Sequence, residues 1–398
     1  MVRLQGSIMH LLTNPIRSEE MLAETVDIKH RFYASSSEPL TSGRLLWESL
    51  RRSDFKLVWQ SMFHSLGYAE NGGSLDLRIE VAKLYGENIS ADDIVIFPGA
   101  QTGMTLTALA LLHEGDHAII ITPSYQSLEE GPKFAGCSIT RVALSPDDGW
   151  ELDLDKVESA IIPGKTKYLA LNEPHNPSGH LMSAETQSKL VTLCEKHDIM
   201  LFSDEVYRLL ELNPDKDRLP AAAELSDRAI SLNTMSKPWG AGGMGIGWVI
   251  TRDKTVKEKL LKAQHIFAVC FSRAGEIQAM RAIRASERLI AKNVAIIKDN
   301  LALLDTYFVD NADLFEWVRP VAGGTGFVKF KGPLTGDELA KELGEEEILV
   351  FPPSIFDCDE SLQHYIRIGF SRRTMPAALQ AFAKFVDERR AQWGFSRG

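Results

Sequence analysis

Cysteine and long apolar runs are both scarce in this sequence of 398 residues. The four cysteines (Cys137, Cys194, Cys270 and Cys358) are far apart and form no Cys-x-x-Cys pair. This pattern indicates free thiols in a reducing compartment rather than a disulfide framework, so we expect a cytoplasmic protein. No stretch of 18 or more apolar residues occurs, and the first residues lack the apolar centre of a secretory signal. We therefore expect no membrane-spanning helix and no membrane partner.

Clusters of lysine and arginine are also missing. The chain has 44 basic and 54 acidic residues, which gives a formal charge of −10. Because an acidic surface repels phosphate backbones, we expect no nucleic-acid partner. The hydrophobic content of 44% is ordinary for a globular protein and excludes disorder over most of the chain.

Short apolar runs alternate with longer amphipathic stretches through the middle of the chain. The predicted strands there cover 94–97, 117–122, 138–144, 168–171, 199–203, 229–233 and 248–251. The predicted helices include 100–112, 183–197 and 255–268, and 254–308 is mainly helical. Beyond it we expect a small α+β unit with strands at 326–330, 348–351 and 365–369 and a final helix at 376–393. This alternation predicts an α/β fold whose ligands bind at the carboxyl ends of mostly parallel strands.

Five polar or glycine-containing segments follow predicted strands. They cover 97–101, 123–125, 172–179, 203–207 and 231–237. The first is a turn into a helix N-terminus, which suits a phosphate. The third is a rigid polar loop with two prolines, and the fourth places Asp204 at the end of a buried strand, where its carboxylate needs a cation. The fifth places Lys237 before a glycine-rich loop, where desolvation favours Schiff-base chemistry. Taken singly, each has an ordinary alternative as a turn, a packing aromatic, a salt bridge or a solvated lysine.

Two further patterns do not predict sites. Gly240, Gly242 and Gly245 have dinucleotide-binding spacing, but a strand rather than a helix is expected after them. Cys194 and His197 have ligand-like spacing without a second pair nearby, so we expect no metal site.

The five segments, in this order and spacing, resemble the class I and II aminotransferases, which are pyridoxal-phosphate enzymes of fold type I. The resemblance runs from about Ser37 to Arg373 and rests on Asn-x-Pro-x-Asn-Pro-x-Gly at 172–179, Asp-Glu-x-Tyr at 204–207 and Ser-Lys-x-x-Gly at 236–240. It implies a large domain with a mostly parallel seven-stranded sheet between helices and a smaller α+β domain. We expect an N-terminal arm with part of the small domain at 1–50, the large domain at 51–308 and the rest of the small domain at 309–398.

The resemblance also implies how pyridoxal 5'-phosphate is held. Lys237 would form the Schiff base and later carry the Cα proton, and Asp204 would hold the pyridinium nitrogen, which keeps the ring an electron sink. Tyr207 and Asn176 would hydrogen-bond the ring hydroxyl oxygen. Tyr125 would stack on the ring.

For the phosphate, the resemblance implies the backbone amides of Ala100 and Gln101 together with the Thr234 hydroxyl. Ser236 is a further candidate for the same role. Tyr68 stands where the family sends a tyrosine across a dimer interface to the neighbour's phosphate, which implies a homodimer with shared active sites.

Arg367 matches the arginine that binds the α-carboxylate of the substrate, a group that a guanidinium can hold with two hydrogen bonds. One position departs from the family: most relatives have a phosphate-binding arginine eight residues after the lysine, where this chain has Gly245. Arg208 or a residue of a partner subunit could replace it. Glu38, near the expected entrance, could meet a basic substrate side chain or be an ordinary surface carboxylate.

These residues predict an enzyme that deprotonates an L-amino acid at Cα. The favoured activity is an aminotransferase that passes the amino group to a 2-oxo acid. Because of Gly245, a non-transaminating enzyme on the same scaffold is the alternative, either a β- or γ-eliminating lyase or a cyclase or oxidase of a guanidino amino acid such as an arginine derivative. A non-catalytic binding protein is the third interpretation, which Lys237 and Asp204 argue against.

Overall fold

The computed structural model describes residues 16–24, 28–356 and 358–395. Its centre is a seven-stranded sheet in the order β2-β8-β7-β6-β5-β3-β4. Neighbouring strands are parallel except at β8, which is antiparallel to both β2 and β7. The strands are β2 (Ile94–Phe97), β3 (His117–Thr122), β4 (Ser138–Ala143), β5 (Thr166–Asn172), β6 (Met200–Asp204), β7 (Ala229–Thr234) and β8 (Gly247–Ile250). The predicted mostly parallel sheet of seven strands is confirmed.

Helices cover both faces of this sheet, which explains why its strands are almost continuously apolar. In β3, Ala118 and Ile120 belong to one apolar core, whereas Ile119 and Ile121 belong to the core on the opposite face. The first core contains residues of α6 (Ala100–Leu111), α7 (Ser127–Phe134) and α12 (Lys254–Phe267). The second contains residues of α8 (Leu154–Ser159), α9 (Ala184–Lys196) and α11 (Ala222–Leu225).

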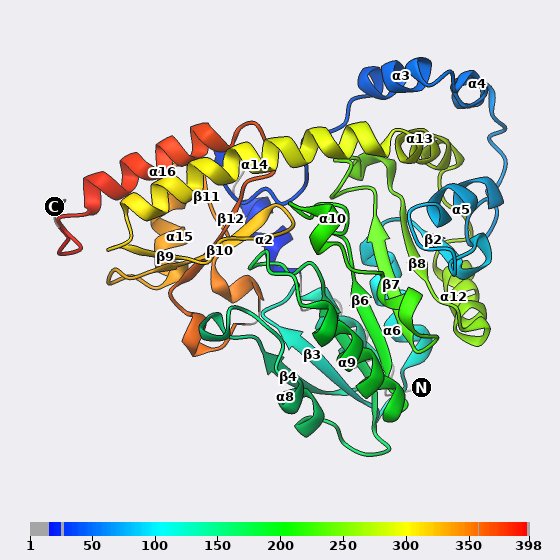
Figure 1. Ribbon diagram of the computed structural model, residues 1–398, viewed down its shortest axis with the longest axis horizontal. Coiled ribbons are helices and arrows are strands. Elements are labelled where there is room, and N and C mark those ends of the chain that lie inside the picture. The colour runs from blue at the N-terminus through cyan, green and yellow to red at the C-terminus, as the bar shows by residue number, and fades with distance from the viewer. Residues whose placement is uncertain (1–15, 25–27, 357, 396–398) are drawn as a thin grey trace.

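Two smaller sheets form a second part of the molecule (Figure 1). One is antiparallel, in the order β12-β10-β9, and consists of β9 (Phe315–Trp317), β10 (Thr325–Phe330) and β12 (Tyr365–Gly369). The other pairs β1 (His30–Arg31) in parallel with β11 (Ile348–Leu349), so the N-terminal region packs with the C-terminal one. Helices α15 (Gly336–Glu345) and α16 (Met375–Arg389) complete this part.

Helix α14 (Ser286–Asp310) is 25 residues long and runs beside α16 across the top of Figure 1. Asn293 Nδ2 donates to the Pro238 carbonyl at 2.8 Å, directly after Lys237. Asn300 Nδ2, seven residues further on, donates to the Phe370 carbonyl at 2.8 Å, just past β12. One helix therefore binds both the loop that carries Lys237 and the end of the strand that carries Arg367.

Five helices lie outside these layers or connect them. They are α2 (Arg17–Glu24), α3 (Ser42–Arg51), α4 (Phe55–Phe63), α5 (Leu75–Ala82) and α10 (Pro214–Asp217). Helices α3 and α4 project from the rest of the molecule at the upper right of Figure 1. None of the helices in the described ranges is both long and apolar enough to cross a membrane.

The predicted elements of the large sheet agree with the structure to within about two residues at each end. The predicted helical region 254–308 is divided into α12, α13 (Arg273–Arg284) and α14. The predicted strand 348–351 is shorter, because only β11 pairs in a ladder and Phe351 forms an isolated bridge with Arg367. The final helix ends at Arg389, before the predicted residue 393, and β9 was not predicted.

Candidate active site

A cavity of about 460 Å³ opens at the carboxyl ends of the large sheet's strands. Segments that follow β2, β3, β5, β6 and β7 all contribute to its wall, as expected for an α/β sheet. All but one of the predicted site residues line it, namely Ala100, Gln101, Tyr125, Asn176, Asp204, Tyr207, Thr234, Ser236, Lys237 and Arg367. The fold thus gathers residues that are up to 267 positions apart in sequence, from Ala100 to Arg367.

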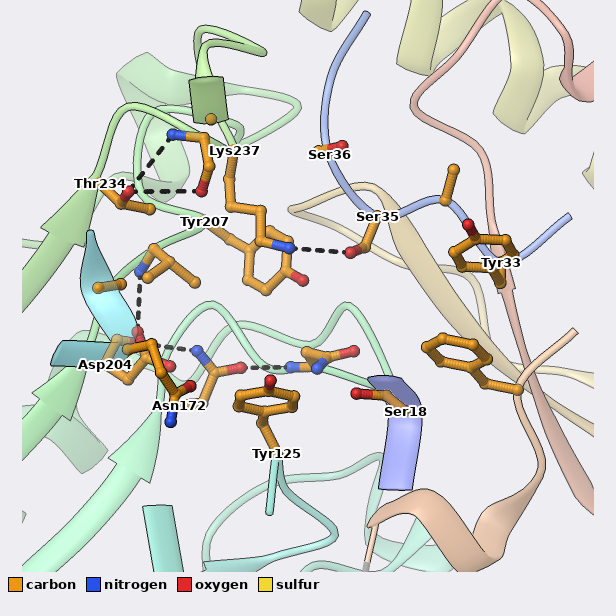
Figure 2. A pocket seen from close by; sticks show the side chains of 18 of the residues that line it. Ser18, Tyr33, Ser35, Ser36, Tyr125, Asn172, Asp204, Tyr207, Thr234 and Lys237 are labelled. Carbon is orange, nitrogen blue, oxygen red and sulfur yellow. Dashed lines mark hydrogen bonds between the residues drawn. The ribbon is translucent and has the colours of Figure 1, made fainter. Parts of the chain in front are cut away.

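Lys237 enters the cavity from the loop after β7, and Tyr125 points in from the opposite side (Figure 2). The lysine Nζ donates a hydrogen bond to Ser35 Oγ at 3.0 Å. It also lies 5.5 Å from the centre of the Tyr207 ring. A flat ring bound to Lys237 would therefore lie near the Tyr207 ring, while stacking by Tyr125 stays a prediction.

Asp204 ends β6 at the bottom of the cavity and is only 3% exposed. Burial raises the pKa of its carboxyl group to about 7, opposed by the Val206 N–H and the charge of Lys237 and assisted by Glu205. In the described part of the chain, its carboxylate accepts one hydrogen bond, from Val206 N at 3.3 Å. A buried carboxylate with so little support needs a cationic donor, and a protonated pyridine nitrogen fits that need.

The loop after β5 is fixed by hydrogen bonds that do not involve a ligand. Asn172 Nδ2 donates to the Asp204 carbonyl, and Asn172 Oδ1 accepts from Asn176 N, both at 2.7 Å. Burial lowers the pKa of His175 to about 4, so its ring is neutral near pH 7. Its Nε2 therefore donates to the Pro123 carbonyl at 2.8 Å, while Nδ1 accepts from the Ser178 hydroxyl at 2.6 Å. His175 connects this loop to the one that carries Tyr125, a role the sequence did not indicate.

The N-terminus of α6 forms one end of the cavity. Gly99 precedes the helix with φ of +86°, and the first N–H groups of a helix have no partner within it. A Cβ atom on Gly247 would lie 2.7 Å from the Gly99 carbonyl carbon, so β8 needs glycine to pass this turn. The Thr234 hydroxyl, which donates to the Ile246 carbonyl at 3.1 Å, lines the same cavity. Free N–H groups bind a phosphate, and the Thr234 hydroxyl would join them by turning its proton away from the Ile246 carbonyl.

Arg367 is a buried cation that has no carboxylate partner within the described ranges. Its Nη1 donates to Asn176 Oδ1 at 3.0 Å and its Nη2 to the Tyr33 carbonyl at 2.7 Å. Its guanidinium carbon lies 4.5 Å from the Phe351 ring centre, and its Nε is buried without a hydrogen bond. Burial lowers the pKa of Arg367 to about 10, yet the group stays charged at neutral pH. An incoming carboxylate would supply the missing counter-charge.

Tyr68 is the predicted site residue that the fold does not bring to this cavity. Its side chain is 88% exposed and lies outside the lining of the cavity. A role for Tyr68 in this chain's own site therefore has no support from the structure. What remains is the role that the resemblance implied, in a neighbouring subunit's site.

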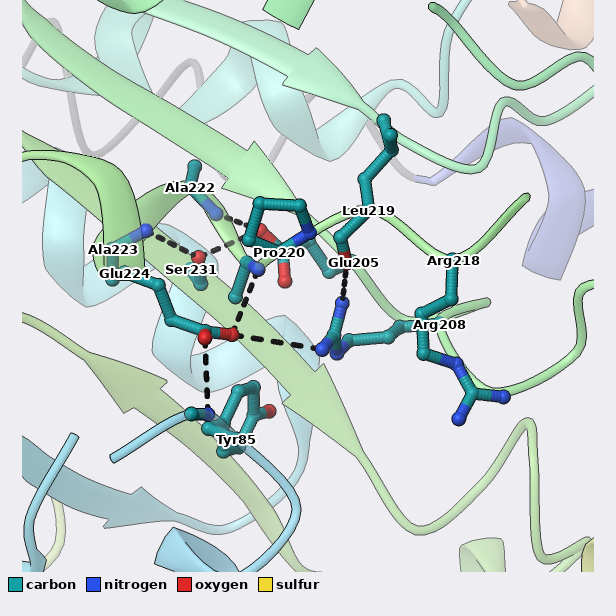
Figure 3. A network of polar contacts seen from close by, with 12 residues as sticks. Tyr85, Glu205, Arg208, Arg218, Leu219, Pro220, Ala222, Ala223, Glu224 and Ser231 are labelled. Carbon is teal, nitrogen blue, oxygen red and sulfur yellow. Dashed lines mark hydrogen bonds and ion pairs between the residues drawn. The ribbon is translucent and has the colours of Figure 1, made fainter. Parts of the chain in front are cut away.

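Arg208 does not replace the missing arginine, and the prediction that it could is wrong. Its side chain belongs to a separate polar network (Figure 3) and lines a different pocket from that of Lys237. There it donates to the Leu219 carbonyl, pairs with Glu224 at 3.6 Å and lies 5.4 Å from the centre of the Tyr85 ring. The same network surrounds Glu205, a buried carboxylate that needs a nearby cation. Arg208 is thus held by structural partners away from the cavity.

The structure also shows the surroundings of Gly245, the glycine in place of the expected arginine. Gly245 has φ of +62°, follows the 3-10 turn Gly242–Met244, and has no atom within 4 Å of where a Cβ would stand. The glycine-rich segment leads into β8 and not into a helix, as the sequence predicted.

Glu38 accepts a hydrogen bond from the backbone N–H of Arg373 at 3.0 Å and does not line the cavity. The proposed contact between Glu38 and a basic substrate therefore has no support.

Several residues of the cavity wall were not predicted. Ser18 and Leu22 of α2, together with Arg31, Tyr33 and Arg372, come from segments that precede or follow the large sheet in sequence. They share no spacing or motif that a single sequence could reveal. Ser35 and Ser36 also line the cavity.

Comparisons with known proteins show the family to which the chain belongs. The family model "Aminotransferase class I and II" matches residues 56–382. A probable aspartate aminotransferase of Methanocaldococcus jannaschii is 28% identical over 315 residues, which cover 77% of this chain and 81% of that protein. Capreomycidine synthase of Streptomyces vinaceus is 24% identical over 348 residues, 86% and 87% of the two chains. The crystal structure of a PLP-dependent aminotransferase from Streptococcus suis superimposes with a TM-score of 0.85 at 26% identity, covering 94% of this chain and 98% of the other.

Proposed function

This chain belongs to the class I and II aminotransferase family, and on that premise we propose that it moves the amino group of an L-amino acid to a 2-oxo acid. The cofactor of the family, pyridoxal 5'-phosphate, supplies an electron sink for the carbanion formed at Cα and a carrier for the amino group. The observation that carries the proposal is the arrangement of three ionisable side chains around one cavity of about 460 Å³, namely the half-buried Lys237 and the buried Asp204 and Arg367.

Each of these residues has a task that follows from its surroundings. Lys237 would hold the cofactor through its amine and, when that amine is free, would move the proton at the substrate Cα. Asp204 would keep the pyridine nitrogen protonated through a charge-assisted hydrogen bond. Arg367 would orient the substrate through its α-carboxylate, and Asn176 and Tyr207 would hold the ring hydroxyl oxygen. The walls formed by Phe351 and Phe356 exclude water from the Arg367 guanidinium.

The proposal includes a homodimer in which Tyr68 enters the partner's site. Support comes from a concentration of exposed apolar side chains on α3, α4 and the segment that follows, namely Trp47, Phe55, Trp59, Met62, Phe63, Leu66 and Tyr68. An apolar surface of this kind is typical of a protein interface. We also propose a cytoplasmic location, supported by the four free cysteines.

A second candidate function is a lyase, cyclase or oxidase that uses the same Cα deprotonation. The similarity to capreomycidine synthase over most of both chains supports it, as does the glycine in place of the phosphate-binding arginine. A guanidino substrate would need an anionic partner. In the described part of the cavity wall, the acidic residue is Asp204, which the cofactor requires. We therefore favour the aminotransferase.

The test is to add single amino acids to the cofactor-loaded protein without a 2-oxo acid and to follow the visible absorption spectrum. An aminotransferase converts its cofactor once to the amine form and stops until a 2-oxo acid is supplied. Repeated turnover with release of ammonia, loss of water or uptake of oxygen would replace the proposal by the second candidate. A Lys237→Ala variant should show no turnover, and undiminished turnover would contradict the assignment of the lysine.

A further inference from the structure

The segment 34–38, which we call the serine strap, crosses the cavity between the Lys237 loop and the end of β12. Ser37 N donates to the Lys237 carbonyl at 3.3 Å. On the other side, Ser371 Oγ lies 3.0 Å from the Ala34 carbonyl oxygen and 2.8 Å from the Ser36 carbonyl oxygen. The strap is therefore bound to both walls by its backbone, independently of its own hydroxyl groups.

Two glycines allow this close fit. A Cβ atom on Gly240 would stand 2.1 Å from the Glu38 carbonyl oxygen, and one on Gly369 would stand 2.2 Å from the Ala34 carbonyl oxygen. Both distances are far below van der Waals contact, so any larger residue would push the strap out of place. Because the strap is fixed at both ends, the Ser35 side chain between them has a defined position before any ligand binds.

The three serines of the strap have different surroundings. Ser35 Oγ accepts the hydrogen bond of Lys237 Nζ at 3.0 Å, as Figure 2 shows. Ser36 Oγ accepts from Arg372 Nη2 at 2.7 Å. Ser37 Oγ is buried without a hydrogen-bond partner in the described part of the chain. One strap thus offers a serine on the reactive amine and, two residues away, a serine whose hydroxyl makes no such contact.

We propose that Ser35 is a positioning residue for Lys237, which holds the free amine of the lysine at the cavity during the steps in which that amine moves the Cα proton. The inference rests on the proposed function. A hydroxyl can accept from an ammonium group and can donate to a neutral amine. Ser35 can therefore remain bound to Lys237 while the lysine gains and loses its proton. Without this contact, the flexible four-carbon stem would let the amine leave the reacting geometry.

The kinetic test compares Ser35→Ala with Ser35→Thr, which keeps the hydroxyl, and with Ser37→Ala as the matched control. For Ser35→Ala we expect kcat to fall about tenfold with little change in KM, the effect of losing one hydrogen bond to a charged group. The isotope effect with Cα-deuterated substrate should increase, because the proton transfer by Lys237 becomes slower. Ser35→Thr should restore most of the rate. Ser37→Ala should behave as the wild type, since its hydroxyl has no partner to lose.

A second readout needs neither cofactor nor substrate. In cofactor-free protein, the Lys237 amine should be modified by a small amine-directed reagent at least about threefold faster in Ser35→Ala than in Ser37→Ala, because one hydrogen bond no longer competes. Mass spectrometry of the peptide that contains Lys237 measures that rate. Equal modification rates, an unchanged isotope effect or equal losses of kcat in the two alanine variants would overturn the proposal. A wild-type protein that transfers no amino group would defeat the proposed function but would leave this labelling result interpretable.

Discussion

Asn176 Oδ1 accepts a hydrogen bond from Arg367 Nη1 at 3.0 Å, although the two residues are 191 positions apart. Asn176 follows β5 of the large sheet, and Arg367 lies in β12 of the small antiparallel sheet. The side chain proposed to hold the cofactor's ring oxygen is thus bonded to the one proposed to hold the substrate's carboxylate. Because the guanidinium still has an unpaired Nε, carboxylate binding can complete its hydrogen bonds and tighten Asn176 at the same time.

Replacing Arg367 by lysine should show how much of the carboxylate binding depends on the planar shape of the guanidinium and how much on its charge. Lysine keeps the positive charge but cannot hold a carboxylate and Asn176 together in one plane. We expect KM for the amino acid to rise about 100-fold, since disturbing a buried charged pair costs about 2–5 kcal/mol. Steady-state kinetics measure the change. Arg319→Lys, at an exposed ion pair with Asp305, is the control and should leave KM as it is. Equal KM values in both variants would contradict the carboxylate role.

Asp204 should make the stability of the cofactor-free protein depend on pH. Its pKa is about 7 in the folded chain against an ordinary 3.8, so between these values the folded state binds more protons than the unfolded state. Stability should therefore fall as pH rises from about 4 to 7, by at most about 4 kcal/mol from this group. Asp204→Asn removes that contribution. Melting curves from pH 4 to 8 should show a flatter profile for the variant, and parallel profiles would show that Asp204 is not the source.

Arginine at position 245 should strengthen cofactor retention, since the family resemblance places a phosphate-binding guanidinium there. The site has open space for the side chain, but its φ of +62° makes a non-glycine residue cost about 1–2 kcal/mol. We expect Gly245→Arg to melt a few degrees lower without cofactor and to release cofactor more slowly in dialysis. Gly164→Arg is matched in backbone conformation, open space and added charge. A similar gain in cofactor retention in both variants would show that the added net charge alone is the cause.

A charge placed on the exposed apolar surface of α4 should prevent dimerisation. Trp59 and Phe63 are both more than 60% exposed, and their ring centres lie 4.2 Å apart. Trp59→Glu should give monomers in light-scattering measurements and should lose activity with them, because Tyr68 then has no partner site to enter. Val309→Glu changes a similarly exposed apolar residue on α14 and should have no such effect. A fully active Trp59→Glu monomer would rule out shared sites.

The central sheet and the part of the cavity wall at the carboxyl ends of its strands could be predicted from the sequence. The strands are buried on both faces, so their apolar runs are nearly uninterrupted, and the polar residues that end them stand out. Asp204 is the clearest case, because a carboxylate at the end of the buried strand Met200–Asp204 needs a cation or another hydrogen-bond donor as its partner.

The parts that were not predicted depend on contacts between distant segments. From the sequence, Arg208 is a reasonable cation for the phosphate. Its contacts with Tyr85, Leu219 and Glu224 exclude that role, and no spacing in the sequence reveals them. Glu38 is bound by a backbone N–H of Arg373, a donor that no sequence pattern displays. The role of Ser35 likewise requires the strap to be placed beside Lys237, which only the folded chain does.

Helix α14 sets the distance between the two ends of the site. Asn293 and Asn300 are two turns apart, about 10.5 Å along the axis, and they grip the loop after Lys237 and the chain after Arg367. Inserting one residue between them would move the second grip by about 1.5 Å and turn it by roughly 100° around the axis. The distance between the Lys237 amine and the Arg367 guanidinium is therefore set by the length of α14. Substitutions at the opening of the cavity could therefore change the substrate far more readily than they could change this distance.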